Sequence, residues 1–159
     1  MNNRENWKKN VCFLSLFCLL SIILGGKSNS TEELVLALGS ANDALVSTGS
    51  TGGAYSLASI SNRDFNGQPC LGFSDPRPDR ILRLQSDFAY LTFEVNSNGK
   101  DTTLVIKSLE DGIVRCAFGQ DRNRDAVIYD SNWSAGVYHV WVGSMVPNRR
   151  SSYRLSIKP

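Results

Sequence analysis

The chain has 159 residues and a formal net charge of +2, and 42% of its residues are hydrophobic. This length favours one domain with some accessory sequence. Residues 1–30 carry four of the 17 basic residues and one of the 15 acidic ones, so the remainder has a formal net charge of −1. The basic excess therefore belongs to the N-terminus, which argues against nucleic acid as a partner.

The N-terminus has three parts. Residues 1–10 are basic, Val11–Leu24 is an apolar run, and small and polar residues follow as far as Ser30. This succession predicts a secretory signal peptide over residues 1–30, because the apolar run is shorter than the roughly 20 residues of a membrane-spanning helix. A retained membrane anchor is the alternative. We expect an exported protein of the periplasm, cell surface or extracellular space, without stable membrane insertion once the signal is removed.

The segment after the predicted signal shows no clear element. Residues 32–44 are compatible with a helical turn or a strand, and residues 46–53 have the Gly, Ser and Thr content of a flexible linker. We predict a linker over residues 31–53 and a domain over residues 54–159.

Strand signals recur throughout the predicted domain. In the strongest segment, residues 137–142, Tyr138, Val140 and Val142 share the face that we expect to point inward. The whole pattern predicts an all-β fold, an antiparallel β-sandwich of about eight short strands. The expected strands are residues 54–60, 81–84, 91–95, 104–107, 113–118, 127–129, 137–142 and 153–157.

The four cysteines form two groups. Cys12 and Cys18 lie in the predicted signal peptide, whereas Cys70 and Cys116 lie in the predicted domain. An even pair in an exported chain predicts a disulfide between Cys70 and Cys116, and two buried free thiols are the alternative. A bridge over this separation contributes roughly 4 kcal/mol in the chain-entropy description.

The strand motifs as a set resemble a known family. The pieces are SDFAYLTFEV, KDTTLVI, the EDG hairpin leading to Cys116, AGVYHVWVGS and YRLSI. Over residues 54–158 they resemble the bacterial pre-peptidase C-terminal (PPC) domain in its stand-alone exported form. The resemblance implies a jelly-roll-like sandwich that is a non-catalytic appendage of secreted proteases, with calcium or a polymer bound by some members. The family's acidic pair after the residue matching Cys116 is replaced here by Ala117 and Phe118, which argues against calcium at that point.

Aromatic residues are the first candidates for a binding site. Trp133 lies in a predicted loop, and His139 and Trp141 lie on the predicted outer face. Exposed aromatic rings stack on sugars and peptides, so we expect a binding patch there for cell-wall glycan or a secreted protein. Burial of both tryptophans under loops is the alternative.

Metal binding and catalysis have weaker signals. Asp121, Asn123 and Asp125 place oxygen ligands at alternate positions, as calcium loops do, but the Gly and the acid required further on are missing. A solvated loop is the alternative, and we expect no other cofactor. His139 is the single histidine, and no Gly-x-Ser-x-Gly element accompanies it, so we do not expect a catalytic site.

The sequence thus predicts a non-enzymatic, exported binding or accessory module of unknown ligand. A structural cell-envelope protein without a specific ligand is the first alternative, and a hydrolase or hydrolase-associated domain is the second.

Overall fold

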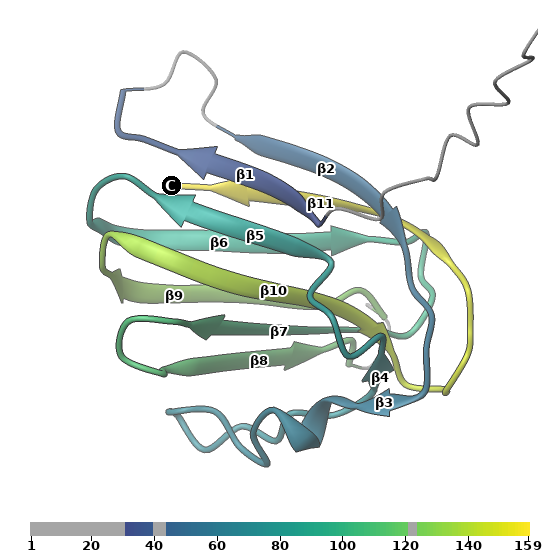
Figure 1. The fold of residues 1–159 in the computed structure, drawn as a ribbon. Coiled ribbons are helices and arrows are strands. Elements are labelled where there is room, and N and C mark those ends of the chain that lie inside the picture. The colour runs from purple at the N-terminus through teal and green to yellow at the C-terminus, as the bar shows by residue number, and fades with distance from the viewer. Residues whose placement is uncertain (1–30, 40–43, 121–123) are drawn as a thin grey trace, which may run out of the picture.

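Two β-sheets face each other across a hydrophobic core (Figure 1). The structure is a computed structural model that describes residues 31–39, 44–120 and 124–159. The predicted signal peptide, residues 1–30, lies outside the described residues. The predicted all-β sandwich is confirmed, and the helical element within the described ranges is a 3-10 turn, η1 (Leu57–Ser59). No helix in these ranges is long and apolar enough to cross a membrane.

The first sheet is built around β10, which pairs with β5 along one edge and with β7 along the other. β1 extends the sheet by pairing with β5 in parallel, and β8 extends it on the other side by pairing with β7 in antiparallel orientation. The short strands β4 and β3 join at the end of β10. The bounds are β1 (Glu32–Leu36), β3 (Tyr55–Ser56), β4 (Phe73–Ser74), β5 (Arg80–Leu84), β7 (Thr102–Ser108), β8 (Val114–Phe118) and β10 (Gly136–Ser144).

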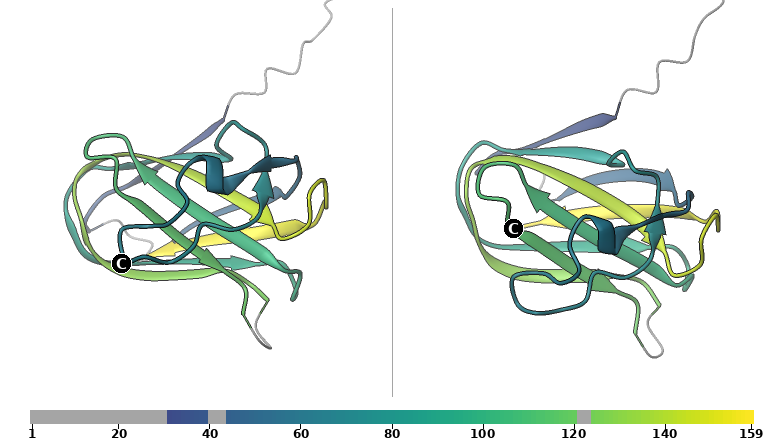
Figure 2. Two further views of the ribbon diagram at one scale, coloured as in Figure 1. Left: turned by 90° about the horizontal axis from the view of Figure 1, so that it is seen from below. Right: turned by 60° about the horizontal axis from the view of Figure 1, so that its bottom comes forward.

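The second sheet has the order β2-β11-β6-β9, and all of its pairs are antiparallel. Its strands are β2 (Leu45–Ser50), β6 (Phe88–Asn96), β9 (Val127–Trp133) and β11 (Ser152–Lys158). In the view from below in Figure 2, this sheet lies beneath the first.

The predicted linker over residues 31–53 is wrong, because β1 and β2 lie within it and belong to the two sheets. β1 contributes Leu34 and Leu36 to the core. The Gly and Ser content of β2 hides its strand character, since small residues are needed on its inner face. A Cβ atom at Gly49 would collide with the hydroxyl group of Tyr153 on the neighbouring strand.

The strands predicted from residue 81 onward are all observed, and several are longer than expected. The strand predicted at residues 54–60 is replaced by the two-residue β3 and η1. The inward positions follow the predicted alternation, with Tyr138, Val140 and Val142 on β10 all buried between the sheets. The same alternation buries Leu91, Phe93 and Val95 on β6 and Tyr153, Leu155 and Ile157 on β11.

A second, smaller core covers the outer face of the first sheet. The segment from η1 to β4 crosses that face, as the view from below in Figure 2 shows. Leu57 packs there with Val105 and Trp141 of the sheet. The predicted disulfide between Cys70 and Cys116 is confirmed, with its Cα atoms 5.2 Å apart, and it ties the segment to β8.

The loop before β5 is held to β10 by Asp79. Its backbone N–H donates to the carbonyl oxygen of Val140 at 2.8 Å, and its carboxylate accepts a hydrogen bond from the backbone N–H of Val142 at 2.8 Å. Burial raises the pKa of Asp79 to about 6, although the Val142 hydrogen bond and the nearby Arg80 oppose this shift. The fold therefore retains a carboxyl group that is costly to ionise.

We predict that replacing both bridged cysteines, Cys70→Ala with Cys116→Ala, lowers the free energy of unfolding by about 2–5 kcal/mol. The bridge spans a sequence separation of 46 and anchors the segment over the first sheet. Urea unfolding with and without reductant measures the effect. Reductant should weaken the wild type and leave the double variant unchanged, and equal stability in all four samples would contradict the prediction.

We predict that the wild type loses stability relative to Asp79→Asn as the pH rises from about 4 to about 7. The folded pKa of about 6 exceeds the ordinary value of 3.8, so the folded state holds this proton more tightly. Ionisation therefore favours the unfolded chain, and the difference approaches about 3 kcal/mol. Urea unfolding of both proteins across this range is the measurement. Parallel stability curves would show that burial does not perturb this carboxyl group.

Candidate binding site between two sheet edges

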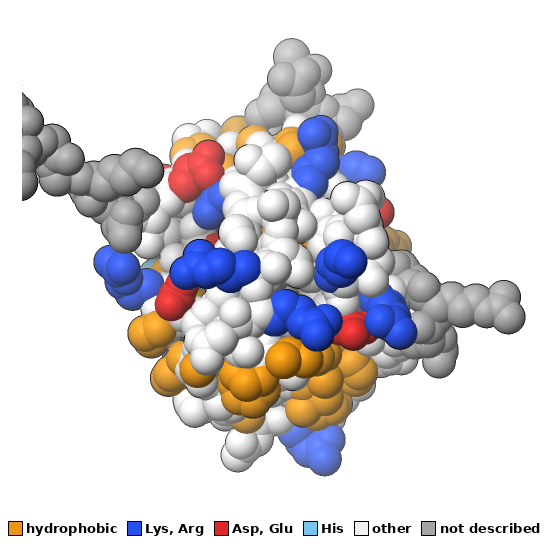
Figure 3. All heavy atoms as spheres, turned by 90° about the vertical axis from the view of Figure 1, so that its right-hand side faces the viewer, with side chains coloured by type: hydrophobic (Ala, Val, Ile, Leu, Met, Phe, Trp, Pro, Cys, Tyr) orange, Lys and Arg blue, Asp and Glu red, His pale blue; other side chains and the backbone are white. Residues whose placement is uncertain are grey.

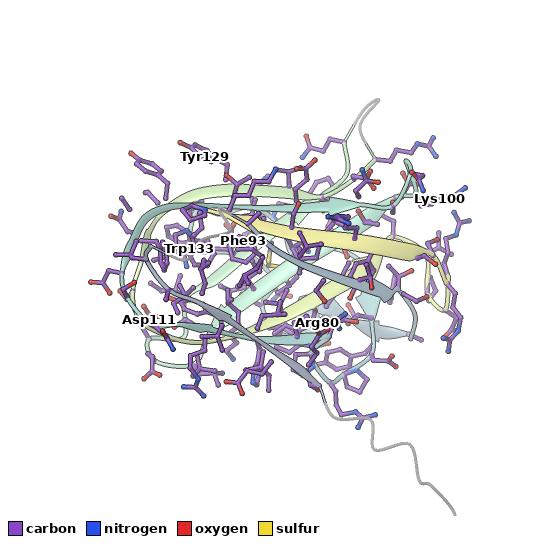
Figure 4. All side chains as sticks on the ribbon, turned by 90° about the horizontal axis from the view of Figure 1, so that it is seen from above. Arg80, Phe93, Lys100, Asp111, Tyr129 and Trp133 are labelled. Atoms are coloured by element: carbon purple, nitrogen blue, oxygen red, sulfur yellow. A yellow bond between two sulfur atoms is a disulfide. The ribbon has the colours of Figure 1, made fainter. Side chains whose placement is uncertain are left out.

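Trp133 lies in the core, which corrects the prediction of an exposed loop residue. It is the last residue of β9 and is 1% exposed. Its ring packs against Phe93 and Tyr138 at centroid distances of 4.9 and 5.5 Å, and its Nε1 donates to the carbonyl oxygen of Asp130 at 3.0 Å. Figure 4 shows Trp133 and Phe93 side by side between the sheets. This burial leaves no free ring face for a ligand.

Trp141 and His139 lie on the outer face of the first sheet, but that face is covered. Trp141 is 6% exposed, and its Nε1 donates to the carbonyl oxygen of Pro76 at 3.4 Å. The His139 ring meets Trp141 edge-on at 5.7 Å, and burial together with nearby Lys107 lowers the pKa of His139. The three residues of the predicted patch are therefore not brought together, since Trp133 belongs to β9 of the second sheet and lies in the core between the two sheets.

The predicted calcium ligands are placed only in part. Asp121 and Asn123 lie outside the described residues. The carboxylate of Asp125 accepts hydrogen bonds from the backbone N–H and the hydroxyl of Ser97. The described ranges contain no group of three His, Cys, Asp or Glu side chains that could hold a metal. Calcium at this loop stays a prediction.

A different site lies where one edge of each sheet meets the other. β8 forms an edge of the first sheet and β9 an edge of the second, and the two strands are neighbours in space. Arg115 of β8 crosses between them and is 4% exposed. Its Nε donates to the Asp130 carboxylate at 2.6 Å, and its Nη2 donates to the carbonyl oxygens of Ser131 and Asn132 at 3.3 and 3.2 Å.

Two aromatic rings complete the surroundings of Arg115. Its guanidinium carbon lies 3.9 Å from the ring centroid of Trp133 and 4.9 Å from that of Phe65. A desolvated cation over an aromatic face is attracted by the ring quadrupole. Because these rings and the β9 acceptors offset the cost of burying the charge, Arg115 fixes the relative positions of the two edges.

A loop that includes Asp64 caps one part of the β8 edge. The Asp64 carboxylate accepts hydrogen bonds from the backbone N–H groups of Asn66, Gln68 and Cys116 at 2.9, 2.8 and 3.2 Å. The backbone N–H of Phe65 donates to the carbonyl oxygen of Val114 at 3.1 Å. The loop therefore has a defined shape and presents Phe65, which is largely exposed, beside Arg115.

Two adjoining clefts follow this junction of edges. One has a volume of about 180 Å³ and the other about 230 Å³. They share Gln68, Ala117 and Val127 as lining residues, so together they form one polar groove between β8 and β9. The first cleft is also lined by Asp64, Asn66, Arg115, Cys116, Ile128, Tyr129 and Asp130.

An exposed tyrosine pair stands at the rim of this groove. Tyr90 of β6 and Tyr129 of β9 are 54% and 70% exposed, and their rings stack at 5.7 Å with an interplanar angle of 7°. Tyr129 also lines the first cleft. In Figure 4 Tyr129 projects outward from the sheet, in the opposite direction to Trp133. We call the two tyrosines, Phe65 and the first cleft the edge site.

Sequence reasoning missed these residues although one signal was available. The alternation that places Leu91 and Phe93 inward also places Tyr90 outward. Tyr129 has the same relation to its buried neighbour Ile128. The larger tryptophan rings give the stronger signal for a binding patch in the sequence.

Comparison with known proteins finds a likeness among solved structures. No family model and no curated protein matches the sequence. Among solved structures, the pre-peptidase C-terminal domain of collagenase from Bacillus anthracis matches with 17% identity and a TM-score of 0.46, covering 81% of this chain and 97% of that chain. The chain is similar to a PPC domain. This is the family that the strand motifs resemble.

We predict that Arg115→Ala lowers the free energy of unfolding by about 3–5 kcal/mol, because the Asp130 carboxylate then loses its buried partner. Arg83→Ala is the matched control. It removes an exposed ion pair with Glu33, whose atoms lie 2.9 Å apart, and should cost at most about 1 kcal/mol. Urea unfolding compares them. A loss for Arg115→Ala no larger than for the control would mean that Arg115 does not join the edges.

Proposed function

We propose that this protein is a non-enzymatic, exported binding module that contacts an extended polymer, a cell-wall glycan, through the edge site. The observation that carries the proposal is the stacked and exposed pair of Tyr90 and Tyr129 beside a polar groove. Large rings that are exposed on a sheet leave apolar surface in contact with water. Exposed apolar surface of this kind marks binding patches.

The chemistry of the edge site suits a sugar polymer. The outer faces of the tyrosine rings offer apolar contact to the C–H faces of sugars, and their hydroxyl groups donate and accept hydrogen bonds. The amide side chains of Asn66 and Gln68 line the adjacent cleft and pair with hydroxyl groups in the same way. The two clefts of the groove adjoin through shared lining residues, so successive units of a polymer can contact both.

The acids of the first cleft, Asp64 and Asp130, support binding in preference to catalysis. Asp64 accepts three backbone hydrogen bonds, and Asp130 is held by Arg115. Both carboxylates therefore serve the protein's own structure. General acid–base chemistry requires a group that is free to exchange a proton with the substrate.

The disulfide fits the proposed location. Bridges such as Cys70–Cys116 persist in oxidising compartments, which include the periplasm and the extracellular space. The predicted signal peptide agrees with this location.

We predict that Tyr90→Ala with Tyr129→Ala weakens binding to insoluble cell-wall glycan at least about thirtyfold, as expected for loss of an aromatic hot spot. Both side chains are exposed, so the free energy of unfolding should change by less than about 0.5 kcal/mol. Depletion of soluble protein by purified wall glycan gives the affinity, and urea unfolding checks the fold.

The matched control is Tyr90→Phe with Tyr129→Phe, which keeps both rings and removes only the hydroxyl groups. It should retain most of the affinity if stacking dominates. Equal binding by wild type and the alanine variant would refute the edge site as the glycan surface. If the wild type binds an unfolded protein used as a probe but does not bind glycan, the ligand is a secreted protein and not a glycan. Binding to neither would favour a structural role.

A further inference from the structure

One end of the sandwich carries exposed lysine and arginine side chains. Figure 3 looks onto this end and shows Lys and Arg side chains in a band beside a group of hydrophobic side chains. Backbone hydrogen bonds identify the loops that meet there. The N–H of Asn148 donates to the carbonyl oxygen of Gly53 at 2.7 Å, and the N–H of Met145 donates to the carbonyl oxygen of Asp101 at 3.3 Å. We call Lys100, Arg149 and Arg150 the basic end.

The two arginines stand on a loop that is firmly held. The hydroxyl of Thr51, which is buried, donates to the carbonyl oxygen of Arg149 at 2.8 Å and accepts from the N–H of Ser151 at 3.0 Å. The N–H of Thr51 also donates to the carbonyl oxygen of Ser151 at 2.9 Å. These bonds use only backbone atoms of the loop, so both guanidinium groups are presented outward from a rigid base.

Cations outnumber acids among the described residues of this end, where the Asp125 carboxylate is hydrogen-bonded to the hydroxyl of Ser97 next to Lys100. Within the described ranges, none of the three side chains of the basic end forms an ion pair, whereas Arg124 nearby is paired with Asp101 at 3.5 Å. The adjacent loop adds one charge of each sign, through Asp75 and Arg77. A net positive potential therefore extends from this end.

The opposite end of the sandwich is acidic. Asp87, Glu110 and Asp111 lie in the loops there, and Figure 4 shows Asp111 and Lys100 at opposite ends of the molecule. The charge is thus separated along the strand direction. A negatively charged surface attracts one end, repels the other and so orients the molecule.

Apolar side chains accompany the cations in the same loop. Met145 and Val146 are exposed directly before Pro147 and the two arginines. An anionic polymer in water needs only the charges, whereas a lipid surface offers charged headgroups and an apolar layer beneath them. The combination favours a bilayer.

The start of the described chain lies near this end. Thr31 donates through its hydroxyl to the carbonyl oxygen of Pro78 at 3.3 Å, one residue beyond Arg77. The apolar run Val11–Leu24 precedes Thr31 by residues 25–30 only, and so few residues span roughly 20 Å at full extension. If that run stays in a membrane as an anchor, Thr31 is kept close to the headgroups.

We propose that the basic end docks on the surface of an anionic phospholipid bilayer, with Arg149 and Arg150 at the headgroups and Met145 and Val146 at the interface. This proposal is independent of the glycan proposal, because it uses a different surface. It holds whether the signal peptide is removed or retained, since both cases present the same end.

The test measures binding of purified exported protein to vesicles by sedimentation. Vesicles of 30% phosphatidylglycerol in phosphatidylcholine are compared with pure phosphatidylcholine. We expect binding to the anionic vesicles only, and weaker binding as salt is raised. Arg149→Gln with Arg150→Gln should lower the partition coefficient roughly thirtyfold, because each cation near such a surface contributes about fivefold. Equal binding to both vesicle types would overturn the proposal.

The matched control is Arg83→Gln with Lys158→Gln, which removes the same total charge from exposed ion pairs elsewhere. It should retain most of the binding. If it loses as much binding as the Arg149 and Arg150 variant, the attraction depends only on net charge, and the proposal is overturned. Met145→Ser with Val146→Ser should weaken vesicle binding but not binding to soluble polyphosphate. If the serine variant binds vesicles as the wild type does, the surface recognises an anionic polymer and the bilayer proposal fails.

Discussion

The burial of Arg115 is the constraint on which the junction between the two sheets depends. A guanidinium group can lie in this interior only if its charge is compensated and its N–H groups are hydrogen-bonded. The acceptors come from the end of β9, where Asn132 has a φ of 59° and turns the chain so that two successive carbonyl oxygens reach Arg115. The buried ring of Trp133 lies against the same cation. The contacts of β9 with the charged Arg115 therefore help to set the position of this strand, and with it that of Tyr129 at the rim.

Most of the sandwich could be predicted from the alternation of apolar and polar residues. The inward positions of β6, β10 and β11 follow the period of two, because one face of each strand meets the core. The alternation fails for β2, whose inward positions include Ser47 and Gly49. The bulky Tyr153 occupies the space beside Gly49, and the hydroxyl of Ser47 is hydrogen-bonded to Glu32 and Arg80. The alternation also fails after residue 130, where Ser and Asn indicate a loop although the chain remains paired as far as Trp133.

The candidate site could not be predicted in the same way. Its polar members, Asp64, Arg115 and Asp130, come from a loop and two strands that are far apart in the sequence. No local motif joins them, so only the folded arrangement shows that they share a groove. The size that makes a tryptophan ring a good binding surface also favours its burial, because a large ring contributes most when it is removed from water. The tyrosines remain outside.

The N-terminal strands have a consequence for how the domain is delimited. β1 borders β5 in one sheet, and β2 borders β11 in the other, so this short stretch of chain closes both layers on the same side of the sandwich. A protein that began at residue 54, where the family resemblance begins, would leave β5 and β11 with unpaired backbone groups. It would also remove Leu34 and Leu36 from the core. Exposed strands of this kind pair with those of other molecules, so such a shortened chain would be prone to aggregate.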